Sequence, residues 1–236
     1  TYFQTLSLGL DYKDFRDSLV VTGADTLNTP IHYTSLALRY DGTLRTGAGL
    51  TRFSLGAHFG LRGLGSGPGR FNDKRIFSRR NFFYLRGDFH DTRPLPRGFR
   101  LLTRLSGQVS DSPLISNEEF SAGGMDSVRG YHESEVLGDN GVAGSLELQG
   151  PSFAKWLGRG VRELRLFAFG DGAKVTVRSP LPGQTGGFVL SSAGVGIRLA
   201  AWKRLNGTLD WSYPFKDAGT VQAGDTRIDF LLGYEF

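Results

Sequence analysis

The 236-residue sequence contains no cysteine, a single methionine and no apolar run near the ~20 residues that a membrane-spanning helix needs. The absence of cysteine excludes disulfides, a thiolate metal site and a cysteine nucleophile. The absence of long apolar runs excludes a helical membrane protein. At 39% hydrophobic and 22% charged residues, the chain is nevertheless too apolar to be disordered.

Histidine is also scarce, and the four histidines show no ligand spacing: His32, His58, His90 and His132. We therefore expect no metal site, and no Ser/His/Asp spacing suggests an enzyme or a bound cofactor. The adjacent Glu118 and Glu119 are expected to be solvated in a loop. The net charge of +5 fits a solvated surface, or arginines that line a polar lumen or meet anionic head groups. Alternating strands explain the basic and aromatic residues without nucleic acid.

Glycine (34 residues) and phenylalanine (18 residues) are abundant, which indicates an all-β protein with many turns. The strongest signal is an alternation with period two, clearest in the last segment. One face is large and apolar: Ile228, Phe230, Leu232, Tyr234 and Phe236. The other face is mostly polar: Arg227, Asp229, Gly233 and Glu235. A lipid-facing barrel strand has this arrangement, with hydrocarbon outside and a polar lumen inside.

Nine further segments show the same alternation, which gives about ten strands of the ~9–11 residues that span a bilayer at a tilt. They are residues 6–12, 35–40, 44–61, 84–89, 100–109, 142–149, 164–171, 194–199 and 208–215. Their polar faces predict a set of charged residues that line the lumen: Arg39, Arg86, Asp88, Arg104, Arg165, Arg198 and Asp210.

The connections between these segments alternate in length. Short ones fall near residues 41–43, 92–98, 150–160 and 203–204, and long ones at 16–30, 62–80, 111–141, 172–187 and 216–225. Outer-membrane barrels have short periplasmic turns and longer external loops. The sequence therefore predicts an all-β, transmembrane antiparallel β-barrel of the bacterial outer membrane, with its C-terminal end on the periplasmic side.

An unpaired strand edge cannot face lipid, so ten strands must either close a narrow barrel or belong to a larger one. The chain has no signal peptide and opens inside a strand-like pattern, which favours the larger barrel. We expect residues 1–236 to form a single outer-membrane barrel domain that is the C-terminal portion of a longer protein.

The longest loop contains Gly123-Gly124 followed by Val128-Arg129-Gly130-Tyr131. On its own this could be a glycine-rich surface loop. The motif, and its place before the fifth-from-last strand, resemble the signature of outer-membrane protein translocases and insertases. These include the TpsB transporters of two-partner secretion and the BamA-type insertases. The resemblance implies a sixteen-strand barrel, with this loop folded into the lumen and its arginine paired with an acidic residue on the inner wall.

The second half of that pairing is Phe169-Gly170-Asp171, which matches the Phe-x-Asp pattern of the family's inner wall. The alternation places Phe169 and Asp171 on the lumen face. The resemblance thus implies an ion pair between Arg129 and Asp171. A buried arginine needs a carboxylate, and a hydrogen-bonded pair would hold the loop in one place.

Residues 8–15 and 144–151 resemble TpsB strands of the ShlB/FhaC/HecB type, and BamA-type loops more often have phenylalanine at the position of Tyr131. The resemblance covers the last ten strands. The first six strands, the plug helix and the POTRA domains are not in this sequence.

The resemblance implies secretion of a large haemolysin- or adhesin-type partner (a TpsA exoprotein) without a cofactor. It also implies contacts with outer-membrane lipid and lipopolysaccharide, and with the barrel assembly machinery during biogenesis. The alternatives are a BamA-type insertase and a passive porin-like barrel.

Overall fold

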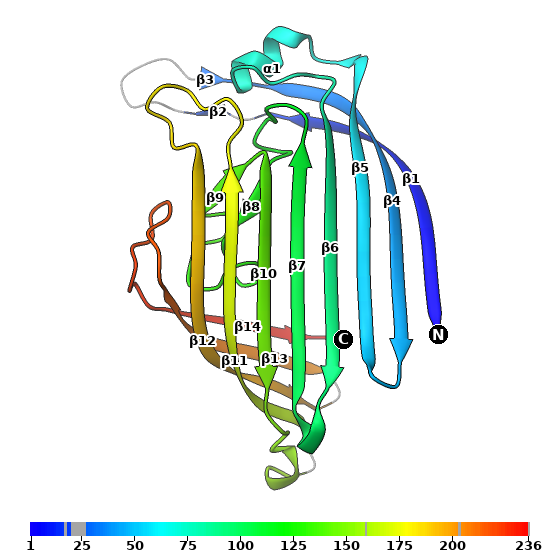
Figure 1. Cartoon of the computed structure of the whole chain (residues 1–236), viewed down its shortest axis with the longest axis vertical. Coiled ribbons are helices and arrows are strands. Elements are labelled where there is room, and N and C mark those ends of the chain that lie inside the picture. The colour runs from blue at the N-terminus through cyan, green and yellow to red at the C-terminus, as the bar shows by residue number, and fades with distance from the viewer. Residues whose placement is uncertain (17, 20–26, 159, 203, 236) are drawn as a thin grey trace.

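A computed structural model describes the whole chain except residues 17, 20–26, 159, 203 and 236. Ten long strands form one sheet in which every neighbouring pair is antiparallel (Figure 1). In sheet order they are β1 (Tyr2–Phe15), β4 (Ile31–Thr46), β5 (Gly49–Gly65), β6 (Phe83–Pro94), β7 (Arg100–Ser110), β10 (Asn140–Gln149), β11 (Val161–Thr176), β12 (Gly187–Ala201), β13 (Leu205–Pro214) and β14 (Arg227–Tyr234). The predicted ten-stranded antiparallel architecture is confirmed.

The smaller elements lie in the connections. They are β2 (Ser18–Leu19), β3 (Leu27–Asn28), the helix α1 (Pro68–Lys74), β8 (Phe120–Ala122), β9 (Val136–Gly138) and the 3-10 turns η1 (Pro96–Gly98) and η2 (Ala154–Trp156). Within the described residues, no helix combines the length and the apolar character that crossing a membrane requires.

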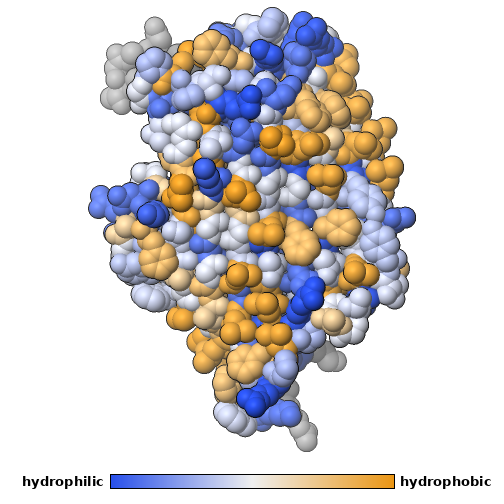
Figure 2. Space-filling view, in the orientation of Figure 1, coloured by the Kyte–Doolittle hydropathy of each residue, from blue (hydrophilic) through white to orange (hydrophobic). Residues whose placement is uncertain are grey.

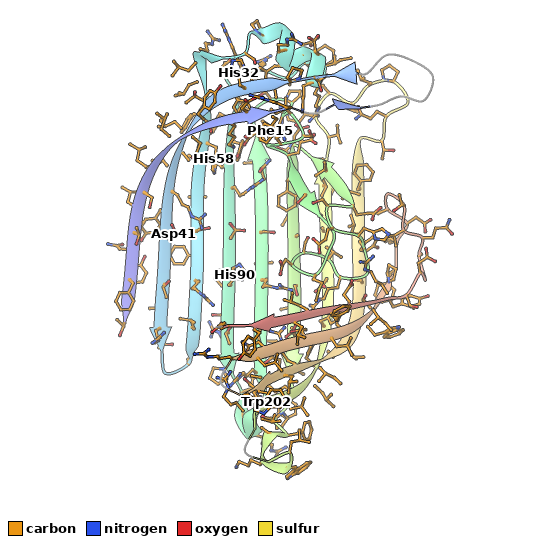
Figure 3. All side chains as sticks on the ribbon, turned by 180° about the vertical axis from the view of Figure 1, so that it is seen from behind. Phe15, His32, Asp41, His58, His90 and Trp202 are labelled. Atoms are coloured by element: carbon orange, nitrogen blue, oxygen red, sulfur yellow. The ribbon has the colours of Figure 1, made fainter. Side chains whose placement is uncertain are left out.

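The sheet is strongly curled. Figures 1 and 3 show β13 and β14 crossing at a steep angle over one side of the wall formed by the preceding strands, on the side where β8 and β9 lie. In the described part of the chain β1 pairs with β4 and β14 with β13, so these two strands are the edges of the sheet. The curl gives the sheet an inner face and an outer face.

The two faces differ as the alternation predicts. Large apolar side chains project from the outer face with little cover, for example Leu8 (72% exposed) and Phe230 (76% exposed), and Figure 2 shows them as patches across the wall. The strand registers place polar side chains on the inner face, where Arg104 lies opposite Ser145 and Ser145 lies opposite Asp171. An apolar exterior around a polar interior is the pattern of a barrel wall in lipid.

One predicted turn is wrong. β4 continues to Thr46 and the reversal falls at Gly47–Ala48, so Asp41-Gly42-Thr43 lies inside a strand. A Cβ on Gly42 would come within 2.4 Å of the Phe53 ring on β5. The glycine therefore marks a close approach of a neighbouring ring and not a turn.

The other connections fall close to their predicted positions. Figure 1 shows the short turns toward one end of the sheet and the loops after β5, β7 and β11 toward the other, whereas the β13–β14 loop lies at one side. Parts of the predicted loop 16–30 and turn 203–204, and the terminal Phe236, lie outside the described residues.

The buried apolar residues form two clusters, and both include loop residues packed against the inner face. One joins the β8–β9 region to the wall: Phe120, Ala122, Val128, Tyr131, Val136, Ala143, Ala173, Val175, Leu190, Ala218 and Val221. The other closes the long-loop end: Ile31, Tyr33, Phe71, Phe82, Tyr84, Leu114 and Ile115. Burial of loop residues against the wall thus fixes where the longest loop lies.

Candidate functional site

The loop between β7 and β10 lies inside the curl of the sheet. Its short hairpin, β8 with β9, stands against the inner face, and Figure 1 shows both strands behind the wall. Val128 and Tyr131 are fully buried, at 0% exposed, and Arg129 between them is 3% exposed. The signature motif is therefore an interior element and not a surface loop.

Arg129 and Asp171 form a bidentate ion pair. The Arg129 Nε atom donates to Asp171 Oδ2 at 2.8 Å, and its Nη2 atom donates to Asp171 Oδ1 at 2.9 Å. The backbone N–H of Arg129 donates to the same Oδ2 atom at 3.1 Å. Side chain and backbone together fix both the position and the orientation of the loop tip.

A second carboxylate completes the arrangement. The Nη1 atom of Arg129 donates to Glu147 Oε2 at 2.8 Å, and its Nη2 atom donates to Ser145 Oγ at 3.1 Å. Arg198 on β12 also contacts Glu147, at 2.9 Å. We call these five residues, Arg129, Ser145, Glu147, Asp171 and Arg198, the Arg129 network. Sequence reasoning missed Glu147, although the polar face of its strand carried the signal.

The guanidinium also stacks on an aromatic ring. Its carbon lies 3.4 Å from the centroid of the Phe169 ring. The neighbour of Phe169 on β12 is Gly194, and its lack of a side chain leaves room for the ring, because a Cβ there would come within 2.4 Å of it. The Phe-x-Asp pattern thus supplies both a stacking surface and a carboxylate for Arg129.

These contacts keep Arg129 charged in spite of its burial. Burial alone would lower the pKa of the Arg129 guanidinium, but hydrogen bonds and charge from Asp171 and Glu147 raise it above its ordinary value. The Arg129 guanidinium is therefore the fixed cation of the network.

Gly130 and Tyr131 complete the fit of the motif. Gly130 has a φ of +90°, and a Cβ there would lie 3.3 Å from Ser212 Oγ. The Tyr131 hydroxyl donates to a carbonyl oxygen, that of Lys216 at 2.8 Å or that of Ser191 at 3.1 Å. Each residue of the motif thus contacts a different part of β11–β13 and the loop after β13.

The other charged residues predicted to line the lumen lie on the inner face but outside the network. Their polar contacts differ: Arg39 contacts Asp41, Arg86 contacts Gln108, Asp88 accepts from Ser54, Arg104 lies 3.9 Å from Asp126, and Arg165 donates to the carbonyls of Gly98 and Gly150. Asp210 is 2% exposed, and its Oδ1 atom has no hydrogen-bond partner among the described residues.

Two hollows with charged residues in their lining lie along the inner wall, and the first of them touches the loop at Asp126 and Ser127. One of about 280 Å³ is lined by Arg104, Asp126 and Ser145, and one of about 490 Å³ by Arg39, Asp41 and Arg52. Both hollows also touch Asp88 and His90, so they adjoin along the inner wall. Figure 3 shows Asp41 and His90 on neighbouring parts of that wall. Within the described residues, no cluster of three or more His, Asp or Glu side chains could hold a metal ion.

The expectation that Glu118 and Glu119 are solvated is wrong. Glu118 is 3% exposed and accepts hydrogen bonds from Lys13, Tyr33 and Tyr84 on three strands. Glu119 pairs with Arg75. The loop folds back under the long-loop end, so both carboxylates face cationic or hydroxyl donors, and no spacing in the sequence signals this.

Arg75 is the centre of a second buried ion network. From the β5–β6 loop it donates to both carboxylate oxygens of Asp139, at 2.8 and 2.6 Å, and to Glu119. Asp139 is 0% exposed and also accepts the backbone N–H groups of Leu114 and Arg178, each at 2.6 Å. We call Arg75, Glu119 and Asp139 the Arg75 network. It joins three long loops at one end of the sheet.

The apolar outer face, the polar inner face and the interior loop define an outer-membrane β-barrel protein. The family model described as "Haemolysin secretion/activation protein ShlB/FhaC/HecB" matches residues 4–199, and the chain belongs to this family. Its outer-membrane location agrees with the sequence prediction. No curated protein matches the chain.

Two solved structures share the fold. CdiB from Escherichia coli superposes with a TM-score of 0.76 at 19% identity, over 99% of this chain and 42% of that one. BamA from Haemophilus ducreyi lacking POTRA domains 1-3 gives a TM-score of 0.64 at 16% identity, over 98% of this chain and 51% of that one. The chain thus spans about half of each structure or less.

Proposed function

We propose that residues 1–236 form the C-terminal part of a larger barrel that secretes a large partner protein, a TpsA-type exoprotein, through a gated pore. The partner would enter unfolded from the periplasm and fold outside. Folding outside can bias the direction of movement, so this route needs no nucleotide or cofactor. The single observation that carries the proposal is the interior loop held by the Arg129 network, in a chain of the ShlB/FhaC/HecB family.

The β7–β10 loop would occupy the pore and would be held there in one position. Its tip is fixed by Asp171 and Glu147, while the two hollows remain along the inner wall at Asp88 and His90. Charged and hydrophilic walls bind an unfolded chain weakly because its apolar side chains find no surface to pack against. The inner-face residues Arg39, Arg86, Asp88, Arg104, Arg165, Arg198 and Asp210 would keep this path wet.

The second candidate is a BamA-type insertase, which the likeness to BamA supports at the level of fold. An insertase would depend on the seam between the first and last strands of its barrel. A passive porin-like barrel is the third candidate, and it gives no reason for a buried loop arginine with two carboxylates. In cells, contacts with outer-membrane lipid, lipopolysaccharide and the barrel assembly machinery would accompany any of the three.

The test replaces Arg129 with Ala in the full-length protein and measures secretion of the partner. We expect a large loss of secretion with the barrel still present in the outer membrane, and a similar loss for Asp171→Ala. Arg45→Ala is the matched control, because it removes an exposed arginine of β4 that lies outside the network and outside the proposed path. Barrel assembly is followed by heat-modifiable migration on gels.

The outcomes separate the three functions. Normal secretion by Arg129→Ala would contradict the transporter proposal. A defect in the assembly of other barrels with normal secretion would favour the insertase. Unchanged secretion and assembly with altered passage of small solutes would favour the porin.

A further inference from the structure

The short-turn end of the sheet carries a continuous surface formed by three turns. The backbone N–H of Trp202 donates to the Gly160 carbonyl at 2.7 Å, which joins the β12–β13 turn to the β10–β11 turn. Arg165 joins the latter to the β6–β7 turn by donating to the carbonyls of Gly98 and Gly150, at 2.8 and 2.6 Å. We call the described residues of these turns, 95–99, 150–158, 160, 202 and 204, the short-turn platform.

The platform exposes large apolar side chains. Trp156 is 82% exposed, Trp202 is 70% exposed and Leu157 is 53% exposed. The rings of Phe153 and Trp156 lie 5.4 Å apart, so the turn presents an ordered aromatic pair. Figure 3 shows Trp202 at the end opposite Phe15 and His32. Exposed tryptophans at the rim of a barrel wall lie at the depth of lipid head groups.

The charge of the platform has one sign. Its described residues include Arg97, Lys155 and Arg204, which are all exposed, and no Asp or Glu. In Figure 2, hydrophilic residues lie beside hydrophobic ones at this end. The long β7–β10 loop is the opposite case, because residues 111–139 hold seven Asp or Glu and one Arg. The platform thus combines exposed basic and apolar side chains where the apolar band of the wall ends.

We propose that the short-turn platform binds the head groups of anionic phospholipids in the periplasmic leaflet of the outer membrane. The tryptophans and Leu157 enter the boundary between head groups and acyl chains, and the basic side chains contact phosphate oxygens. Lys and Arg side chains near an anionic surface are attracted to it, and aromatic side chains add the apolar part. The surface is independent of the Arg129 network and therefore of the proposed secretion function.

The test measures lipid preference directly. The full-length protein is purified in mixed micelles with equal amounts of phosphatidylglycerol and phosphatidylcholine, and native mass spectrometry counts the lipids that stay bound. We expect phosphatidylglycerol to be retained preferentially. The triple variant Arg97→Gln, Lys155→Gln, Arg204→Gln should lower the ratio of the two lipids by about tenfold, and about 0.5 M salt should have a similar effect.

The matched control is Arg62→Gln, Arg70→Gln, Arg79→Gln, which makes the same charge change with exposed arginines at the long-loop end. It should keep the preference for phosphatidylglycerol. Heat-modifiable migration on gels would check that both variants fold. An equal loss in the control would mean that total charge decides the ratio, and no preference in the wild type would mean that another segment covers the platform. Either result overturns the proposal.

Discussion

The Arg129 network and the Arg75 network are built alike and lie in two different parts of the molecule. Each surrounds one loop arginine with two carboxylates, and each pairs it bidentately with an aspartate. They differ in what they join. Arg129 ties a loop to the strands β10 and β11, whereas Arg75 ties one long loop to two others.

They also differ in how much each aspartate depends on its arginine. Asp171 has the side chain of Arg129 and its backbone N–H as partners. Asp139 keeps two backbone N–H donors, from Leu114 and Arg178, if Arg75 is removed. A buried ion pair can thus fix a loop to a strand wall or can tie loops to one another, and the two uses should fail differently.

The largest effect is expected for Arg129→Ala. It leaves Asp171 and Glu147 buried without their main cation, which costs about 3–5 kcal/mol of local stability. The loop tip should leave the wall, and a spin label near residue 128 should become mobile. Arg39→Ala, at an exposed pair with Asp41, should leave that label unchanged. A label that stays immobile in Arg129→Ala would place the restraint in the apolar cluster instead.

Arg75→Ala should have a smaller effect at a different place. Because Asp139 keeps its two N–H donors, we expect a loss of about 1–3 kcal/mol. External protease should cut the long loops faster in intact cells, while the loop tip at Arg129 stays in place. Equal release of the tip in this variant would mean that the two networks form one cooperative unit.

Gly130→Ala tests the loop-to-wall contact without removing a charge. A non-glycine residue at a φ of +90° costs about 1–2 kcal/mol, and the new Cβ presses on Ser212. Reduced heat stability of the loop and partial loss of secretion are expected. Gly170→Ala is the control, since a Cβ there meets nothing within 4 Å.

The smallest effect concerns pH at the Arg75 network. Burial raises the pKa of Glu119 above its ordinary value of 4.5, although Arg75 opposes this shift. The folded loop therefore binds this proton more tightly than the unfolded loop. Its contribution to stability is complete below the ordinary pKa and is lost as the pH rises through the raised one. Loop protection from protease should fall with rising pH in that window, and Glu119→Gln should remove the change.

The wall was predictable because alternation depends only on neighbouring residues. It placed Arg104 and Asp171 on the inner face, and the registers agree. The predicted turn at Asp41-Gly42-Thr43 was wrong, because Gly42 lies inside a strand and leaves room for the ring of Phe53 on the next strand. Local pattern cannot distinguish a turn glycine from one that a neighbouring side chain covers.

The candidate site was predictable only in part, because contacts between loops have no period. Arg129 and Asp171 were paired through a family resemblance and not through spacing. Glu147 lay on a predicted polar face but had no assigned partner. Arg75 and Asp139 are 64 residues apart, and their contact follows from the packing of three loops that no sequence pattern describes.

Gly194 and Gly196 give the inner wall a property that charge alone does not explain. A Cβ on either would overlap the ring of Phe169 or Phe167, at 2.4 and 2.3 Å. The two missing side chains leave a recess one ring deep, and its depth sets the height at which a guanidinium can rest above the wall. The position of the loop is therefore set by volume as well as by charge. A methyl group at either glycine would press on the aromatic ring and also on a backbone carbonyl of β13, that of Trp211 at 2.2 Å or that of Leu209 at 2.5 Å.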